Sequence, residues 1–305
     1  MTSERKIVER ILRSAGIRND DGALVRSRSH ALVASTDISF ASTHAPPGTS
    51  YYDMGWRSAV SNLSDLAAMG AHPLAFLLAL GLPLKISKKA SIQLALGARD
   101  ACKAHSAEYA GGDTKCASEV TLAGFALGEL KGKPLLRNNA RAGDVVCVAG
   151  PIGSAFCGFH ALYKNKTKKA PASLLNAFLR PRALVREASL VSHFAKRAAC
   201  MDVSDGLLFT CSEIARLSNV RIDVESLSIP ISGEVRDYCA ANKIPIERLL
   251  DWGEDYALVF AMSRRDFERL YRKAGLVCIG FASKGSGLYV DGRKTSARGY
   301  DAFKN

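Results

Sequence analysis

Apolar residues follow two different patterns along the chain. Runs of about four to eight apolar residues indicate buried strands, and apolar residues three or four positions apart indicate one face of a helix. The runs predict strands at residues 31–36, 120–127, 144–148, 199–203 and 257–261. The helical spacing predicts helices at the N-terminus and at residues 52–69, 88–105, 182–194 and 207–217. Because strands and helices alternate, we expect an α/β or α+β fold and not an all-helical one.

A polar segment near the middle of the chain is the best candidate for a domain boundary. The 305 residues exceed the length of a typical single domain, so two domains are expected. Residues 137–144 (RNNARAGD) are polar and turn-forming, and a new apolar run follows them. We therefore place an N-terminal domain at residues 1–138 and a C-terminal domain at residues 139–305.

The chain shows neither a membrane segment nor an export signal. Its longest apolar run, residues 73–83, is shorter than the about 18 residues of a membrane helix and is bounded by prolines. The N-terminus is charged, unlike a secretory signal. The eight cysteines are scattered without CxxC pairs, which indicates buried reduced thiols. We predict a soluble, cytoplasmic protein that has no membrane partner.

The net charge of +13 would suit a polyanionic partner. The basic residues are dispersed, however, and they are not interleaved with aromatic residues as in proteins that bind single-stranded nucleic acid. We expect no nucleic-acid partner. A basic protein that handles phosphorylated small molecules fits the same charge.

Acidic residues recur beside glycine, serine or threonine at the ends of apolar runs. The six segments are residues 20–22 (DDG), 35–37 (STD), 62–65 (NLSD), 111–114 (GGDT), 202–206 (DVSDG) and 253–256 (GEDY). Carboxylates at strand ends, flanked by small residues, suit an oxygen-coordinated hard cation, for which magnesium is the first candidate. Each segment alone is better explained by a turn or a helix cap. Six together favour a metal site.

Several other catalytic motifs are absent from the sequence. HExxH, CxxC, GxSxG and GxGxxG do not occur, which argues against nucleophilic-serine and dinucleotide sites. The only approach to a phosphate-binding loop, residues 287–294 (GLYVDGRK), has arginine where lysine is needed. We interpret that segment as a hairpin turn.

Residues 62–71 (NLSDLAAMGA) complete a set of motifs that resembles the thiamine-monophosphate kinase family. The order and spacing of the acidic segments match that family along nearly the whole chain. The wider superfamily includes aminoimidazole ribonucleotide synthetase, selenophosphate synthetase and a hydrogenase-maturation protein. The resemblance implies the two-domain aminoimidazole ribonucleotide synthetase-like fold. In that fold a sheet of the N-terminal domain pairs with its twin in a homodimer, and a C-terminal α/β domain packs against it. ATP and substrate would lie between the halves, near the dimer interface.

The resemblance also implies roles for individual residues. Metal ligands, some acting through a carbonyl or a water, would be Asp21, Ser35, Thr36, Asp37, Asp65, Asp113, Asp202 and Asp205. Asp65 and Asp205 would be catalytic through the metals that they hold. ATP would be contacted by Gly112, Asp113, Arg137 and Ser204, and thiamine monophosphate by His44 and Glu254. Two alternatives stay open, because Arg137 also fits a domain-boundary salt bridge and His44 an ordinary loop histidine.

The activity implied is transfer of the γ-phosphoryl group of ATP to thiamine monophosphate, with several Mg2+ ions, to give thiamine diphosphate. The acceptor phosphate is largely ionised near neutral pH, because its second pKa is about 6, so no general base is needed. We expect direct in-line transfer without a phosphoenzyme. Two alternatives are an enzyme that uses ATP on another small acceptor and a catalytically silent nucleotide-binding dimer.

The sequence departs from the family pattern in segments expected to contact the acceptor. Lys115 stands where a second threonine is usual, and residues 41–45 (ASTHA) replace a segment that usually resembles EGVHF. Trp252 and Gly253 precede Glu254 where a pair of glycines is common. The metal motifs are intact, so the sequence supports the use of ATP and magnesium more strongly than the identity of the acceptor.

Overall fold

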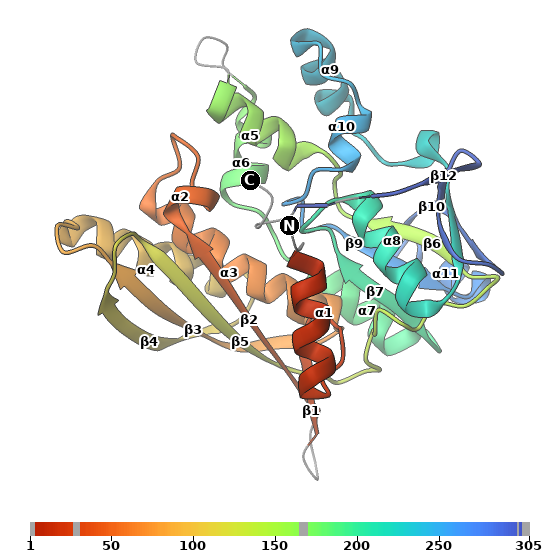
Figure 1. Ribbon diagram of the computed structural model, residues 1–305, viewed down its shortest axis with the longest axis horizontal. Coiled ribbons are helices and arrows are strands. Elements are labelled where there is room, and N and C mark those ends of the chain that lie inside the picture. Colours follow the sequence, from red (N-terminus) through yellow and green to blue (C-terminus); the bar gives the residue numbers. More distant parts are fainter. Residues whose placement is uncertain (1–3, 27–30, 165–169, 298, 301–305) are drawn as a thin grey trace.

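The N-terminal half of the chain forms a five-stranded sheet (Figure 1). The computed structural model describes residues 4–26, 31–164, 170–297 and 299–300. The strands are β1 (Ala23–Arg26), β2 (Ala31–Phe40), β3 (His72–Leu82), β4 (Glu108–Cys116) and β5 (Thr121–Glu129). Their order is β1-β2-β5-β3-β4, and only β3 and β4 pair in parallel.

Two long helices cover one face of this sheet, α3 (Tyr51–Ala68) and α4 (Lys88–Ala104). Ser50 and Asp53 form a capping box at the start of α3, and Ser87 caps α4. The two helices cross closely at Gly55 and Gly97, since a Cβ atom on Gly55 would lie 1.9 Å from the carbonyl oxygen of Leu94. Apolar side chains of both helices pack onto the sheet as one core.

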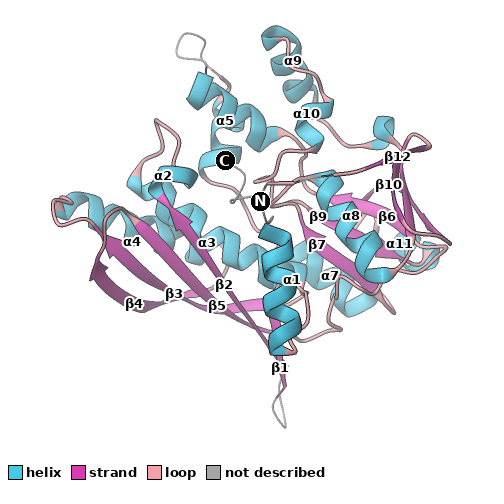
Figure 2. Ribbon diagram, in the orientation of Figure 1, coloured by secondary structure: helices cyan, strands magenta, loops and turns pink. Residues whose placement is uncertain are grey.

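The C-terminal half forms a seven-stranded sheet with helices on both faces (Figure 2). Its strands are β6 (Val145–Ala149), β7 (Ala198–Asp202), β8 (Arg221–Val224), β9 (Leu258–Met262), β10 (Val277–Ser283), β11 (Gly287–Val290) and β12 (Arg293–Thr295), in the order β12-β11-β8-β10-β6-β9-β7. Its helices are α5 (Ser154–Lys164), α6 (Ala172–Leu179), α7 (Val185–Phe194), α8 (Leu207–Ser218), α9 (Gly233–Asn242), α10 (Glu247–Leu250) and α11 (Arg264–Leu270). A 3-10 turn, η1 (Ser226–Ser228), follows β8.

Strand β6 shows how both faces of the second sheet are filled. Val146 and Val148 point into a core shared with α5 and α8, whereas Val145 and Cys147 point into a core shared with α7 and α11. All five residues of β6 are buried, as expected of a strand that is covered on both sides. The second core also contains Ala67 and Ala68 of α3. The last turn of α3 therefore joins the two halves of the molecule.

Two further helices precede α3, namely α1 (Glu4–Ala15) and the short α2 (Ala41–His44), which directly follows β2. No residue of α1 is buried. It is attached to α8 by an ion pair between Arg5 and Glu213, whose Nη2 and Oε1 atoms are 2.9 Å apart. The boundary predicted after residue 138 falls in the connection between β5 and β6.

The α/β class predicted from the sequence is confirmed. The segment 287–294 is a hairpin of β11 and β12, as predicted. Two details of the prediction are wrong. Asp37 and Asp113 do not stand at strand ends but within β2 and β4, because the polar residues around them pair with neighbouring strands. Cys116 is exposed at the end of β4, although all eight cysteines carry free thiols.

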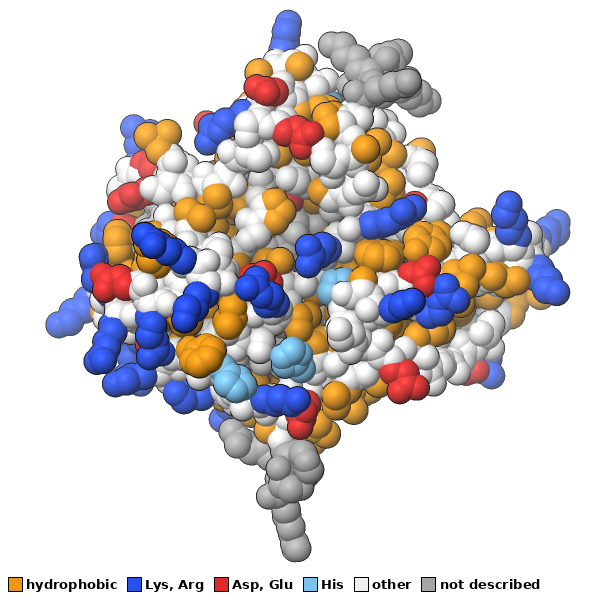
Figure 3. Space-filling model, turned by 180° about the vertical axis from the view of Figure 1, so that it is seen from behind, with side chains coloured by type: hydrophobic (Ala, Val, Ile, Leu, Met, Phe, Trp, Pro, Cys, Tyr) orange, Lys and Arg blue, Asp and Glu red, His pale blue; other side chains and the backbone are white. Residues whose placement is uncertain are grey.

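Lys and Arg side chains lie scattered over the rear of the molecule, between apolar and acidic ones (Figure 3). This distribution agrees with the dispersed basic residues of the sequence. None of the helices in the described parts of the chain has both the length and the apolar character needed to span a membrane.

Candidate functional site

Three aspartates from distant parts of the chain meet where the two halves join. Asp21 lies just before β1, Asp65 on α3 and Asp202 at the end of β7. One carboxylate oxygen from each residue lies within 4.8 Å of the others. The buried strand β7 and the buried end of α3 fix two of these positions, so the packing of the fold brings the carboxylates together.

Serine hydroxyl groups hold these carboxylates in place. Ser35 donates a short hydrogen bond to Oδ2 of Asp65. Ser64 donates to Oδ2 of Asp202 at 2.6 Å, and Ser204 donates to Oδ1 of the same residue at 3.1 Å. Ser64 was not among the predicted site residues, although it belongs to the NLSD segment that was singled out. The hydroxyl groups orient the carboxylates but bring no positive charge.

The electrostatics of the cluster favour a cation. Burial raises the pKa of Asp65 well above its ordinary value, and the neighbouring charge of Asp202 raises it further. Burial also raises the pKa of Asp202 to about 7, with a further contribution from Asp21. The pKa of Asp205 is raised to about 7, by burial first and by Asp202 second. Carboxylates in this arrangement repel one another when ionised, and a hard cation with oxygen ligands would relieve the repulsion.

Arg137, a residue predicted from the sequence to contact ATP, is a cation that lies beside this cluster. Its Nη2 lies 2.5 Å from Oδ1 of Asp21, and its Nε lies 3.0 Å from Oδ2 of the same carboxylate. Its backbone N–H donates to Asp20 at 2.9 Å, and its Nη1 donates to Asn19 at 3.2 Å. Arg137 therefore forms a bidentate salt bridge in the segment that connects the two sheets.

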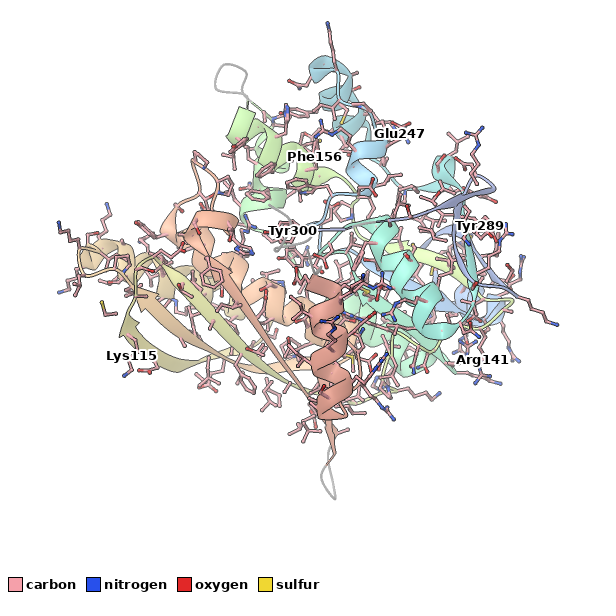
Figure 4. All side chains as sticks on the ribbon, in the orientation of Figure 1. Lys115, Arg141, Phe156, Glu247, Tyr289 and Tyr300 are labelled. Carbon is pink, nitrogen blue, oxygen red and sulfur yellow. The ribbon has the colours of Figure 1, made fainter. Side chains whose placement is uncertain are left out.

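A cavity of about 610 Å3 opens beside Arg137, a volume in the range of small-molecule sites. Its lining includes Ser204 and Asp205, Arg5 of α1, and Tyr300. Tyr300 lies in the centre of the molecule, between the two sheets (Figure 4). Three of the predicted site residues, Arg137, Ser204 and Asp205, thus share one cavity.

Glu254 is attached to the same loop as Ser204 by its backbone. Its N–H donates to the carbonyl of Ser204 at 2.9 Å, and its φ of 67° is unusual for a residue with a side chain. Gly253 permits this contact, because a Cβ atom there would lie 1.6 Å from the carbonyl oxygen of Ser204. Oε2 of Glu254 is 2.6 Å from Nη2 of Arg57. Arg57 was not among the predicted site residues, because its only signal in the sequence is its place two turns before Asp65 on one helix.

His44 and Asp37 lie close to Glu254. The carboxyl group of Asp37 is within electrostatic range of both His44 and Glu254. Nδ1 of His44 accepts the backbone N–H of Phe40 at 3.2 Å and lies 2.6 Å from the hydroxyl of Thr43. The ring of His44 meets the ring of Tyr300 edge-on, with 6.5 Å between the ring centres. Both predicted substrate residues therefore lie within electrostatic range of Asp37.

Three predicted site residues make no side-chain hydrogen bond or ion pair with the three aspartates among the described residues. Asp113 is exposed on the edge strand β4, and its carboxylate lies 3.6 Å from Nζ of Lys115. Lys115 marks the outer end of that strand (Figure 4). Gly112 belongs to the same strand and approaches the backbone of Leu78 closely. The hydroxyl of Thr36 donates to the carbonyl of Gly124 at 2.8 Å. The roles of these residues stay predictions.

Comparison with known proteins gives one consistent result. Residues 19–130 match the family described as AIR synthase related protein, N-terminal domain. The chain is 32% identical to the thiamine-monophosphate kinase of Methanospirillum hungatei over 92% of each chain. It is 32% identical to that of Aquifex aeolicus over 97% of this chain and 96% of the relative. A solved structure described as AaThiL complexed with AMPPCP and TMP superposes with a TM-score of 0.92 at 29% identity, covering 99% of this chain and 97% of that one.

Proposed function

The chain belongs to the thiamine-monophosphate kinase family, and we propose that Asp21, Asp65 and Asp202 hold the magnesium ions of its phosphoryl transfer. It is a thiamine-phosphate kinase, which transfers a phosphoryl group from ATP to thiamine monophosphate. The observation that carries the metal proposal is the convergence of three carboxylate oxygens within 4.8 Å beside an open cavity.

The reaction needs charge neutralisation more than acid or base chemistry. The acceptor oxygen is already largely ionised near neutral pH, since the second pKa of a phosphate monoester is about 6. The obstacle is repulsion between two polyanions that must approach in line. Bound magnesium would supply fixed positive charge between them. The aspartates hold that charge in place, and the serines hold the aspartates. No phosphoenzyme is required.

The cavity beside Arg137 is the proposed site of ATP. Arg137 and Ser204 line it and lie next to the aspartate cluster, so the phosphates of the nucleotide can reach the metals there. A guanidinium group is suited to phosphate oxygens because it presents several N–H donors in one plane. Asp205 lines the same cavity and is the further ligand that we assign to a magnesium ion.

Glu254 and His44 are the proposed contacts to the acceptor. Thiamine monophosphate has a cationic organic part, which suits the carboxylate of Glu254. Asp37 lies within electrostatic range of both residues, so the acceptor would lie between Glu254 and the metal cluster.

The homodimer predicted from the sequence belongs to this proposal. The face of the N-terminal sheet away from α3 and α4 carries exposed apolar side chains, namely Ile38, Phe40, Leu77 and Phe125. Phe125 stands between Thr36 and Leu77 in the register of the sheet, so these side chains form one continuous surface. A second copy of the chain would bury it. The cytoplasmic location also stays a prediction.

The proposed chemistry is tested by product analysis. The protein is incubated with ATP and thiamine monophosphate, with magnesium or with an excess of chelator. We expect thiamine diphosphate and ADP in equal amounts with magnesium and neither with chelator. Undiminished turnover in chelator would contradict the metal proposal. ATP with a chiral γ-phosphoryl group should give inversion at phosphorus, and retention would rule out direct in-line transfer.

A further inference from the structure

Arg57, on α3, is a buried cation beside a residue that we assign to the acceptor. It is only 8% exposed, and its guanidinium carbon lies 4.0 Å from the centre of the Phe178 ring on α6. Its Nη2 makes the 2.6 Å ion pair with Oε2 of Glu254. Its Nη1 is buried and has no hydrogen-bond partner in the part of the chain that the structure describes. Arg57 thus contacts one residue that we assign to the acceptor and keeps one nitrogen free.

An unpaired donor on a buried guanidinium is unusual. Buried polar groups almost always have a partner, because an unsatisfied buried group destabilises the protein, and a charged group does so most. Oε1 of Glu254 likewise takes part in no hydrogen bond among the described residues, and Glu254 holds a left-handed backbone conformation. Such strain is common at sites that bind ligands. The free donor and the free acceptor belong to one ion pair, which indicates a ligand that satisfies both.

Arg57 lies where the end of an extended acceptor would reach if the phosphate at its other end were bound at the metal cluster. Arg57 lies eight residues before Asp65, roughly 12 Å along the helix axis at 1.5 Å per residue. Ser64, which holds Asp202, lies on the same side of the helix as Arg57. An acceptor whose phosphate lies at the metal cluster would therefore place its other end beside Arg57. In thiamine monophosphate that end is the aminopyrimidine ring.

We propose that Arg57 and Glu254 together recognise the aminopyrimidine of the acceptor. An aminopyrimidine presents an amine donor beside a ring-nitrogen acceptor. The ion pair presents the complementary edge, with a carboxylate oxygen to accept from the amine and the Nη1 donor of Arg57 for the ring nitrogen. Arg57 is then a specificity-determining residue as well as the group that fixes Glu254. This inference rests on the proposed position of the acceptor.

The test uses two fragments of the acceptor. Thiamine contains the aminopyrimidine but no phosphate, and 4-methyl-5-(2-phosphoethyl)thiazole contains the phosphate but no aminopyrimidine. Their affinities for the wild-type protein and for Arg57→Met are measured by calorimetry, which needs no turnover. We expect Arg57→Met to weaken thiamine binding roughly 10- to 100-fold, as for loss of a charged hydrogen bond. Binding of the thiazole phosphate and of ATP should stay unchanged.

Control variants separate recognition from folding. Arg221→Met removes another arginine with both an ion pair, to Asp223, and a ring contact, to Tyr289, outside the site. It should leave both affinities unchanged. Arg57→Lys keeps the charge and should retain more thiamine affinity than Arg57→Met. If Arg57→Met does not fold, Glu254→Gln should show the same selective loss.

Two results would overturn the inference. One is equal weakening of both fragments, which would mean that Arg57 acts only on the structure of the site. The other is unchanged thiamine binding in Arg57→Met or, where that variant does not fold, in Glu254→Gln. Failure of the wild-type protein to form thiamine diphosphate would instead contradict the proposed function, because the fragment affinities do not depend on turnover.

Discussion

Asp65 and Asp202 are held in place by serine hydroxyl groups, which cannot neutralise the negative charge of the two carboxylates. Each accepts a serine hydroxyl, and burial with mutual repulsion raises the pKa of both carboxyl groups. Arg137 offsets the charge of Asp21 but leaves the other two carboxylates without an arginine or lysine partner among the described residues. This arrangement costs stability in the metal-free protein and is typical of a site built for a ligand.

Replacement of Asp65 or Asp205 by Asn should separate activity from stability. The amide keeps the shape of the side chain but removes the charge that would bind magnesium, so we expect kcat to fall at least about 100-fold. The melting temperature of the metal-free protein should stay the same or rise, because a repulsive charge is lost. Steady-state kinetics and thermal melts check both. Asp223→Asn, on β8, is the control that should leave kcat unchanged. Activity within tenfold of the wild type would exclude a metal role for the substituted residue.

The sequence predicts the residues of the cluster better than the residues that support them. Asp21, Asp65 and Asp202 stand in recognisable motifs, and the structure brings them together. Arg57 carries no motif, and its pairing with Glu254 joins positions 197 residues apart. Only the packing of α3 against the second half of the chain reveals such a contact. Residues that orient a site through long-range contacts leave no local pattern to detect.

Several elements with a strong apolar pattern were predicted closely, but β3, which contains the longest apolar run of the chain, was not among the predicted strands. The predicted helix at residues 88–105 is α4, Lys88–Ala104, because its apolar face packs on the sheet. Strand β4, in contrast, is an exposed edge strand that contains the GGDT segment, and it has no apolar run to mark it. Its backbone pairs with β3 in spite of its polar sequence. Whether such a segment forms a strand depends on the strand with which it pairs, and that partner lies far away in the sequence.

The end of α4 contains a histidine that should make stability depend on pH. Nε2 of His105 accepts the backbone N–H of Ala183 at 3.0 Å, so the ring is neutral and its Nδ1 donates to the carbonyl of Ala101 at 2.7 Å. Burial, and to a lesser degree the charge of Arg182, lowers the pKa of this ring below its ordinary 6.5. Below pH 6.5 the unfolded chain therefore binds a proton that the folded chain resists. The contribution of His105 to stability should therefore fall with falling pH, by up to about 1.4 kcal/mol per pH unit.

Urea denaturation at pH 7, 6 and 5 checks this effect by comparison with His105→Gln. The difference in unfolding free energy between wild type and variant should shrink as the pH falls, because only the wild type has the histidine. Taking the difference removes the opposite contribution of the aspartates, whose raised pKa values favour the folded state at low pH. The exposed His193→Gln should leave the pH dependence of the wild type intact. A constant difference between wild type and His105→Gln would exclude His105 as the source.

The two halves of the molecule make the site only together. α3 packs against the N-terminal sheet, and its last residues, Ala67 and Ala68, lie in the core of the C-terminal half. This path places Asp65 beside Asp202. Arg137, in the connection between the sheets, pairs with Asp21 near the N-terminus. The predicted boundary after residue 138 therefore lies one residue from a group of the site. A cut there would separate Asp202 from the other two aspartates.

The exposed face of the N-terminal sheet gives a test of the proposed homodimer. Phe125 stands at the centre of that face, next to Leu77 in the register of β5 and β3. Phe125→Asp would place a carboxylate inside the proposed interface. There the carboxylate would lose its hydrating water without gaining a partner, so we expect the dimer to dissociate. Light scattering after gel filtration should give twice the chain mass of 32.7 kDa for the wild type and one chain mass for the variant. Leu227→Asp, on η1 of the C-terminal half, changes a leucine that is 94% exposed and should leave the mass unchanged. A wild-type protein that has the mass of one chain at micromolar concentration would contradict the dimer. In that case the apolar face of the sheet would need a different partner.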